Sequence, residues 1–315
     1  MNYSPVALHI PDGFLTILVS LIFWLITIIM VGFAVSKTNR SLGEKQVPIM
    51  GVMAAFIFAA QMLNFPIAGG TSGHFLGGAL AAIVLGPWAG ILVMTAVVGI
   101  QALLFQDGGL LVMGANIFNM GILTAMIGYG LYRLVIHQKR GIRLVVAGGG
   151  AWIATMAAAL ITSLQLWLSG TTRLEIVLPT MLGVHALIGL GEALITVAAL
   201  AYIEQTRPDI LDVNNPAREG GRGWIVSGIL ISLLAVLVSP LASGNPDGLE
   251  KVASDLGFLG SGLDAPYQLL PDYTIPFLGD TAISTILAGA VGAVVLIGLI
   301  VLLGRNLRRQ KVDDN

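Results

Sequence analysis

The chain has 315 residues, of which 56% are hydrophobic and 10% are charged, and its formal net charge is −1. A soluble domain carries about 25% charged residues, so this composition excludes an ordinary soluble protein and indicates a multi-pass protein of the cell membrane. Because the chain has no cysteine, disulfides and thiolate metal sites are excluded as well.

Apolar runs along the chain predict an all-α bundle of about nine membrane spans. About 20 apolar residues in a helix cross the ~30 Å hydrocarbon core. One long run, 77–105, is interrupted at Gly86-Pro87, so we expect two short or tilted spans there. The other predicted spans are 14–35, 47–63, 115–134, 144–168, 182–203, 224–241 and 281–303.

The distribution of basic residues predicts the topology, because Lys and Arg are enriched in cytoplasmic loops. With the N-terminus outside and the C-terminus in the cytoplasm, only Arg173 and Lys251 of the 16 Lys and Arg residues lie outside. This arrangement places His9 and His74 on the same, outer side of the membrane.

A glycine-rich stretch without charged residues, 64–80, follows the second predicted span and contains His74. Histidine is the commonest metal ligand, and glycine allows the backbone to approach a ligand closely. One interpretation is therefore a ligand site inside a membrane protein. The other is a tight turn between two helices, in which the histidine caps a helix.

The last third of the chain has the composition of an appended module. A hydrophilic linker precedes one span, an acidic outer segment at 243–280, and a closing span. We therefore divide the chain into a membrane core (1–203), a cytoplasmic linker (204–223) and a two-span module (224–315). The acidic segment is either a solvated loop or a lid that concentrates cations over a binding site.

Two ionisable residues, His185 and Glu192, lie seven positions apart in one predicted span and so share a helix face. An intramembrane carboxylate is energetically expensive and is usually functional or paired. The two residues therefore have either a functional role or a structural one, in which a His–Glu pair holds helices together. The pattern favours the structural role.

Four sequence blocks follow one another in the core: LHIPDGFL, NFPIAGGTSGHFLGGALAAIVLGPWAG, QALLFQDGGLLVMGANIFNMG and HALIGLGEALIT. Together they resemble the CbiM/NikM family, the substrate-binding membrane subunit of energy-coupling-factor (ECF) transporters for cobalt and nickel. The sequence PDGLE at 246–250 resembles the small two-span partner subunit, CbiN/NikN. The whole chain is therefore similar to a natural fusion of the two subunits.

The resemblance implies that nitrogen ligands capture Co²⁺ or Ni²⁺. In the family the mature chain begins Met-His. The terminal amine, the next backbone nitrogen and that imidazole bind the metal, and a histidine of the glycine-rich loop completes a four-nitrogen plane, a geometry that suits Ni(II) and can hold Co(II). The matching imidazoles are His9 and His74, with backbone or terminal nitrogens from Leu8 and His9. We therefore expect the mature chain to begin directly before His9, through a start at the Leu8 codon or cleavage after Ala7.

The resemblance also draws attention to polar and small residues near these blocks. Some side chains either orient the ligands or form hydrogen bonds between helices: Gln101, Asn116 and Asn119, with Ser72 in the glycine-rich stretch. Gly51, Ala55 and Ala59 recur every four positions on the second span. They either pack inside the bundle or dock onto the transporter's coupling subunit, because small residues permit close helix approach.

The predicted function is metal capture by this chain, with energy supplied by a transmembrane coupling subunit and ATPase subunits. The sequence contains no Walker A, HExxH or GxSxG motif, so we expect neither ATP hydrolysis nor another enzymatic activity in this chain. No resident cofactor and no nucleic-acid partner is expected. The alternative is a self-sufficient secondary permease or channel. Such proteins usually carry charged residues along a path, whereas here only Glu192 lies clearly within a span.

Overall fold

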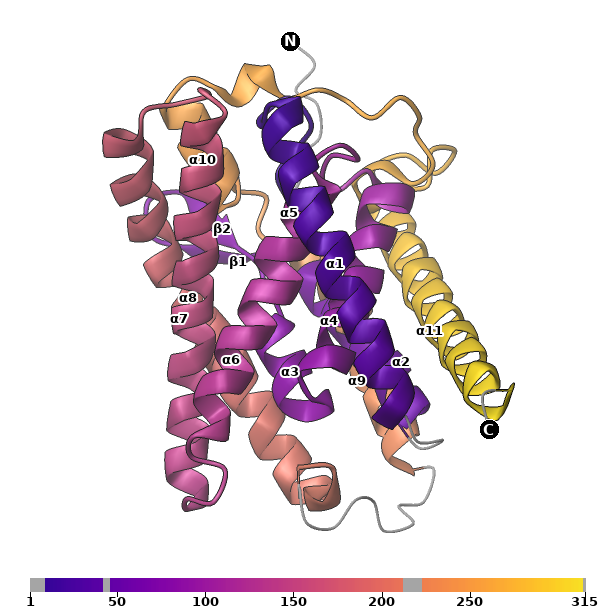
Figure 1. The fold of residues 1–315 in the computed structure, drawn as a ribbon. Coiled ribbons are helices and arrows are strands. Elements are labelled where there is room, and N and C mark those ends of the chain that lie inside the picture. The colour runs from indigo at the N-terminus through magenta and orange to yellow at the C-terminus, as the bar shows by residue number, and fades with distance from the viewer. Residues whose placement is uncertain (1–8, 42–45, 212–222, 314–315) are drawn as a thin grey trace.

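The computed structural model describes residues 9–41, 46–211 and 223–313, which form an elongated helical bundle (Figure 1). Among these residues, six helices are long and apolar enough to cross a membrane. They are α1 (Ile17–Ser41), α4 (Pro87–Ile100) with its π-helical extension η1 (Gln101–Phe105), α7 (Arg140–Leu168), α8 (Leu174–Thr206), α9 (Gly223–Val238) with its extension η4 (Ser239–Leu241), and α11 (Ala282–Asp313). The prediction of a helical, multi-pass membrane protein is confirmed.

The predicted break at Gly86-Pro87 is present. The helix α3 (Gly78–Leu85) ends before it and α4 begins at Pro87, whose missing N–H and fixed φ suit the first helical position. With eight residues, α3 rises only about 12 Å, less than half of the ~30 Å hydrocarbon core. The number of nine spans therefore stays a prediction, and so does the orientation.

A further helical rod crosses the middle of the bundle and contains a second π-helical turn. It consists of α5 (Met113–Asn116), η2 (Ile117–Leu123) and α6 (Thr124–Arg133). Such π-helical turns are frequent at functional sites. Here they bring two buried polar side chains into the bundle, Gln101 from η1 and Asn119 from η2.

The glycine-rich stretch forms a short antiparallel hairpin that the sequence analysis did not predict. Strands β1 (Phe65–Ile67) and β2 (Thr71–Gly73) pair with Pro66 opposite Ser72. The short helix α10 (Gly248–Asp255) of the module packs against β2 and α8. This places the PDGLE motif next to the hairpin.

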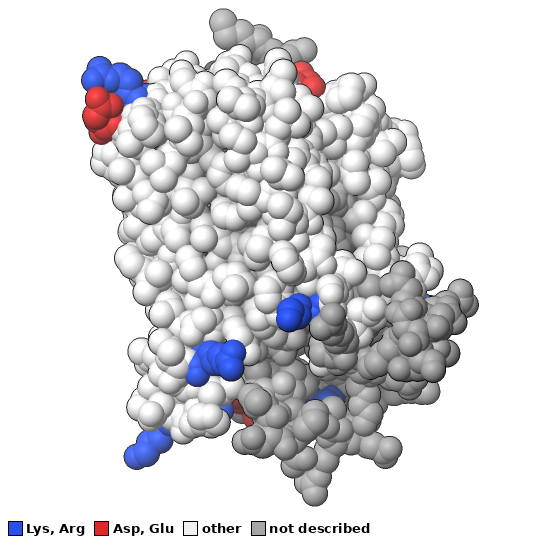
Figure 2. All heavy atoms as spheres, viewed as in Figure 1, with Lys and Arg blue, Asp and Glu red and all other residues white. Residues whose placement is uncertain are grey.

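The surface matches a lipid environment. Figure 2 shows a broad uncharged belt on this face, with charged side chains lying toward the two ends of the molecule. Large apolar side chains are exposed on α1 and α9, including Leu18 (69%), Leu25 (61%) and Leu234 (59%). Contiguous apolar surface of this kind is unfavourable in water but favourable in hydrocarbon, which agrees with a protein embedded in the membrane.

The helix α2 (Gln46–Gln61) is enclosed by other helices of the chain. It packs against α4 of the core and against α9 and α11 of the module. A methyl group added at Gly51 would lie 3.8 Å from the Ile297 side chain of α11, and Ala55 and Ala59 are buried. In this conformation the small residues pack inside the chain, and docking onto a coupling subunit stays a prediction.

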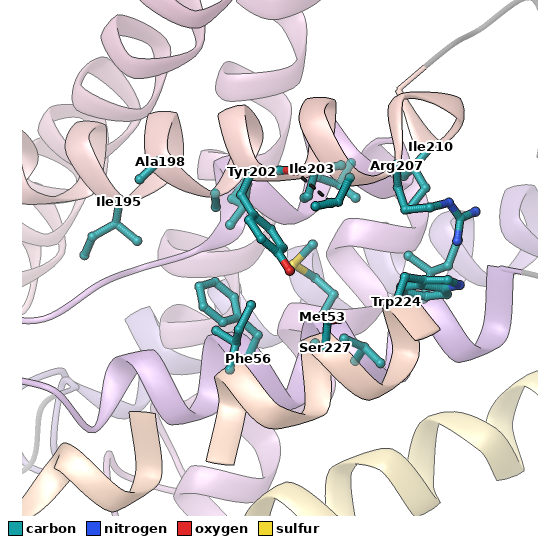
Figure 3. Close-up of a pocket in the computed structure, with 18 residues that line it drawn as sticks. Met53, Phe56, Ile195, Ala198, Tyr202, Ile203, Arg207, Ile210, Trp224 and Ser227 are labelled. Atoms are coloured by element: carbon teal, nitrogen blue, oxygen red, sulfur yellow. Dashed lines mark hydrogen bonds between the residues drawn. The ribbon is translucent and has the colours of Figure 1, made fainter. Parts of the chain in front are cut away.

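An apolar cavity of about 390 Å³ lies between α2, α8 and α9, where the core meets the module (Figure 3). Met53 of α2 and Tyr202 of α8 project into it. The guanidinium of Arg207 lies 5.1 Å from the centre of the Trp224 ring, and both residues line the cavity. Its described lining contains neither a carboxylate nor an imidazole, so the cavity offers no metal ligands of these kinds.

Candidate metal site

His9 and His74 lie next to each other although they are distant in the sequence. Their ring centroids are 5.7 Å apart and their planes are nearly perpendicular, at 87°. The Nε2 atom of His9 and the Nδ1 atom of His74 are buried and have no hydrogen-bond partner. A buried polar group left unpaired costs about 1–3 kcal/mol. These two nitrogens therefore mark a place for a ligand, and imidazole nitrogen is a donor that suits late transition metals.

Glu192 of α8 holds the turn that follows His74. Its carboxylate accepts hydrogen bonds from the backbone N–H groups of Leu76 at 2.6 Å and Gly77 at 3.0 Å. Gly77 has a left-handed φ of 85°, and a Cβ atom there would come within 2.7 Å of Ile57. This position therefore requires glycine, and the turn is fixed by the carboxylate and by close packing together.

The segment that carries His9 is tied to the start of the α5 rod. The carboxylate of Asp12 accepts hydrogen bonds from three consecutive backbone N–H groups, at residues 110–112, over 2.9–3.1 Å. The side chain of Asn116 accepts from the Ile10 N–H at 3.1 Å and donates to the Ile10 carbonyl at 3.0 Å. Asn116 therefore orients the backbone directly after His9, as a residue supporting a ligand would.

Asp107 contacts His9 directly. Its backbone carbonyl lies 3.1 Å and its carboxylate Oδ1 3.2 Å from Nδ1 of His9. When Nδ1 carries the proton of a neutral imidazole, Nε2 keeps its lone pair. The second carboxylate oxygen of Asp107 accepts a hydrogen bond from the Tyr273 hydroxyl at 2.6 Å, and the Gln101 amide donates to that hydroxyl at 3.0 Å.

The two histidines differ in their electrostatic environment. Burial lowers the pKa of His9, but the Asp107 carboxylate outweighs burial and the pKa lies above its ordinary value. Burial raises the pKa of Asp107, but the charge of His9 and the hydrogen bonds from His9 and Tyr273 bring it below its ordinary value. Burial, together with the nearby charge of His9, lowers the pKa of His74 to about 3. Without metal, His9 and Asp107 therefore form a buried ion pair below the raised pKa of His9, beside a neutral His74.

The PDGLE motif lies against His74. Asp247 accepts a hydrogen bond from the Glu250 N–H at 2.9 Å, and the Glu250 carboxylate accepts from the Asp247 N–H at 3.2 Å, so the pair caps α10. The Oδ2 atom of Asp247 is 3.6 Å from Nδ1 of His74, too far for a hydrogen bond. Burial raises the pKa of Asp247 to about 7. This part of the acidic segment packs over the site and is not a solvated loop.

Residues 9–210 match the family model CbiM, described as the cobalt uptake substrate-specific transmembrane region, and residues 222–309 match the PDGLE domain. The chain belongs to the CbiM family. The fused PDGLE domain agrees with the resemblance to CbiN/NikN that the motif indicated.

Relatives of this CbiM-family chain include fused and separate transport proteins. A protein of Archaeoglobus fulgidus, provisionally named the fused nickel transport protein NikMN, is 38% identical over 93% of this chain and 96% of its own length. The cobalt transport protein CbiM of Sorangium cellulosum is 36% identical over 52% of this chain and 76% of its own length. The crystal structure of a truncated transition metal transporter has a TM-score of 0.57 and 36% identity, covering 62% of this chain and 98% of that one. The chain is accordingly a membrane transport protein and not an enzyme.

Two polar residues predicted near the CbiM-type site connect structural elements. Asn119 and Gln165 of α7 exchange hydrogen bonds between their amide groups, at 2.7 and 3.1 Å, as expected for a contact between helices. Ser72 donates through its hydroxyl to the Asn245 carbonyl and through its backbone N–H to the Pro246 carbonyl, each at 2.8 Å. Ser72 therefore holds the start of the PDGLE motif on β2.

His185 and Glu192 do not form the predicted pair. Nδ1 of His185 lies 2.8 Å from the Met181 carbonyl one turn earlier, whereas Glu192 accepts hydrogen bonds from the turn after His74. The expectation was wrong because the glycine-rich stretch brings two backbone N–H groups to the carboxylate. His185 instead lines a small cavity of about 60 Å³ together with His9 and His74.

The chelate implied for the CbiM family uses the other ring nitrogen of His9. Only Nδ1 can close a six-membered ring that contains the metal and the amide nitrogen of the same residue. Here Nδ1 faces Asp107, and Nε2 has no partner. Leu8 lies outside the described residues. Among the residues that the structure describes, no group of three or more His, Cys, Asp or Glu side chains is arranged to hold a metal.

Sequence reasoning missed Asp107 and Tyr273. Asp107 lies in the block QALLFQDGGLLVMGANIFNMG, and an acidic residue directly after an apolar span and before two glycines was a usable signal. No such signal marks Tyr273. Its contact with Asp107 joins positions 166 residues apart and depends on how the module folds over the core.

Proposed function

We propose that this chain captures Ni²⁺ or Co²⁺ for import, with the imidazoles of His9 and His74 as side-chain ligands. The proposal rests on the two buried imidazole nitrogens that have no partner. It is supported by relatives named as nickel and cobalt transport proteins. Nitrogen donors suit Ni(II) and can hold Co(II). The backbone or terminal nitrogens of Leu8 and His9 stay a prediction, and a chelate that includes them takes Nδ1 of His9, which here faces Asp107, in place of Nε2.

Buried carboxylates beside the imidazoles favour a divalent cation over a neutral ligand. Asp107 is 3% and Asp247 is 2% exposed. A dication moved from water into this interior loses its hydration, which is very costly unless negative charge compensates. Asp107 is already ionised, and a cation near His74 would favour ionisation of Asp247 as well. The site therefore offers neutral nitrogen donors together with compensating charge.

The energy for import comes, in this proposal, from the coupling and ATPase subunits of an ECF-type transporter. The chain has no Walker A motif, and its described spans form no evident path of charged residues. The predicted docking residues Gly51, Ala55 and Ala59 are covered by the chain's own helices. Docking at this face would require α11 to move away from α2.

Titration of the purified full-length chain with Ni²⁺ and with Co²⁺ tests the ligand assignment. His74→Ala is expected to abolish high-affinity binding, because it removes one of two imidazole donors. His137→Ala is the matched control, since His137 is exposed in the segment between α6 and α7. Unchanged affinity in His74→Ala would contradict the assignment.

Uptake into vesicles tests the energy source separately. Vesicles with the chain, a coupling subunit and ATPase subunits are expected to accumulate metal only when ATP is supplied. Accumulation by the chain alone, driven by an ion gradient, would contradict ECF coupling. It would support the alternative of a self-sufficient secondary permease or channel.

A further inference from the structure

One face of α8 is hollowed where the core meets the module (Figure 3). The residues of α8 that line the apolar cavity recur three or four positions apart, so they share one face of the helix. They are Ile195, Ala198, Ala199, Tyr202, Ile203 and Thr206. Two alanines occupy the middle of this face, and Ser227 and Gly228 of α9 line the cavity from the other side. Side chains this small leave a space that larger ones would fill.

The cavity has the length of one leaflet of a membrane. Its lining on α8 begins at Ile195 and ends at Thr206, eleven residues further on, which corresponds to about 16 Å of helix. Half of the ~30 Å hydrocarbon core is about 15 Å, the depth that one acyl chain fills. The volume of about 390 Å³ is well above the ~150 Å³ of an apolar cavity that binds benzene. The space therefore suits a single acyl chain.

Close packing is interrupted between α8 and α9. Among the residues that the structure describes, α9 packs against α2 and α11 and makes no comparable contact with α8. Ala198 and Tyr202 line the cavity and are nevertheless exposed, so the space is open to the surroundings of the bundle. Protein interiors are close-packed, and an unfilled apolar space loses the dispersion contacts of its walls. In a membrane, lipid chains are the apolar groups that can fill it.

One end of the cavity carries a cation. Arg207 directly follows α8 and Trp224 lies at the start of α9, so both residues lie at the ends of apolar helices, where a membrane meets water. Among the described lining residues, Arg207 is the only charged side chain. Tryptophan is enriched at membrane interfaces, and basic pockets between spans bind anionic lipid head groups there. A guanidinium has five N–H donors, two of which a phosphate can accept side by side.

We propose that this cavity binds one anionic phospholipid, with an acyl chain between α8 and α9 and the head-group phosphate on Arg207. The apolar walls, the length of one leaflet and the single cation at the interfacial end together match an amphipathic anion. The lipid fills the gap between the core, which contributes α8, and the module, which contributes α9. This inference goes beyond the proposed function and does not depend on the ligands of the metal.

Native mass spectrometry of the purified full-length chain, freed of lipid in detergent, tests the head group. The probes are phosphatidylglycerol and phosphatidylcholine with the same acyl chains. We expect the parent to bind one phosphatidylglycerol about fivefold more tightly than phosphatidylcholine, the effect of about one basic side chain near a membrane surface. Arg207→Gln is expected to bind both lipids alike. Arg133→Gln is the matched control, because Arg133 ends α6, is exposed and does not line the cavity.

Filling the cavity tests where the acyl chain lies. Ala199→Phe places a ring in the hollow, and we expect it to weaken the binding of both lipids about tenfold or more, because excluding about two methylene groups has this effect. Ala198→Leu is a second, milder filling variant, and thermal unfolding without lipid shows whether each variant is folded. Leu187→Phe is the control, because Leu187 is exposed on the same helix and lies outside the cavity.

Three results would overturn the proposal. A parent chain that retains neither lipid has no such site. Equal binding of both lipids to the parent would show that Arg207 does not bind the head group. Parent-like binding in folded Ala199→Phe and Ala198→Leu would place the lipid elsewhere on the surface, and the cavity would then remain for the linker at 212–222 or for a coupling subunit. Titration with Ni²⁺ is a separate measurement, so failure of the lipid site leaves the proposed function standing.

Discussion

The two histidines of the site are held in opposite ways. His9 is held through its ring, by a buried carboxylate that raises its pKa. His74 is held through the backbone that follows it, by Glu192, while its Nδ1 has no partner and its pKa is lowered to about 3. Without metal, His9 therefore holds a second ring proton to a higher pH than His74 does. The comparison shows that two residues proposed as ligands of one metal can contribute differently to the protein without metal.

The largest expected effect is a difference in stability between the alanine variants of the two histidines. His9→Ala leaves the ionised Asp107 buried without its cationic partner, and breaking a buried pair in this way costs about 3–5 kcal/mol. His74→Ala removes a nitrogen that has no partner, so we expect a clearly smaller loss. Thermal unfolding of both variants in detergent without metal measures the difference, with His137→Ala as the control. Equal losses in the two variants would contradict the contrast.

A second prediction concerns a substitution that weakens only the backbone turn after His74. Glu192→Gln replaces a carboxylate that accepts two backbone hydrogen bonds by a neutral amide with one acceptor oxygen. Hydrogen bonds to charged groups contribute about 1.5–3 kcal/mol, so we expect a loss of unfolding free energy of this size together with weaker metal binding. Glu175→Gln on the same helix is the control, because Glu175 is exposed and forms a surface ion pair with Arg173. Parent-like stability and affinity in Glu192→Gln would show that close packing alone fixes the turn.

Hydrophobic patterning predicted much of the fold. The lengths of the apolar runs predicted the long helices, and Gly86-Pro87 predicted the break between α3 and α4. The hairpin at 65–73 was not predicted, because strands of three residues are too short to show an alternating pattern. Its second strand gains hydrogen bonds from the module instead, and these depend on tertiary structure.

Residues of the candidate site could be predicted where their side-chain chemistry or the family resemblance singled them out. His9 and His74 were singled out in this way, and the structure brings them together, while their role as ligands stays a prediction. Glu192 was noticed as a carboxylate within a span, but its partners are backbone N–H groups, which no residue type marks. Tyr273 contacts the site only after the module has folded onto the core.

The dependence of metal affinity on pH tests whether His9 is protonated in the metal-free protein. Because Asp107 raises the pKa of His9, metal must displace a proton there once the pH falls below that raised pKa. The affinity for Ni²⁺ is expected to fall about tenfold per pH unit below that raised pKa. His74, with a pKa of about 3, adds no slope near neutral pH. An affinity independent of pH would contradict the raised pKa of His9.

The stability of the metal-free protein is expected to change with pH in the opposite direction to the metal affinity. The folded pKa of His9 lies above its ordinary value of 6.5 and that of Asp107 below its ordinary value of 3.8. The His9–Asp107 pair therefore stabilises fully between about pH 3.8 and pH 6.5. Its contribution is lost as the pH rises through the raised pKa. Asp247, with a pKa of about 7, titrates in the same range. Asp247→Asn separates the two groups, because a slope that survives this change belongs to His9.

The smallest expected effect concerns the contact between the hairpin and the PDGLE motif. Ser72→Ala removes the hydroxyl bond to the Asn245 carbonyl and keeps the backbone bond to Pro246. A single neutral hydrogen bond contributes about 0.5–1.5 kcal/mol, so we expect hydrogen exchange of the α10 amides to become about 2–10-fold faster. Ser227→Ala is the control, because its hydroxyl donates to a carbonyl of its own helix. If the α10 amides of Ser72→Ala exchange at the parent's rate, packing of α10 against α8 is sufficient to hold the motif. Asp247 would then keep its place beside His74 without help from the hairpin.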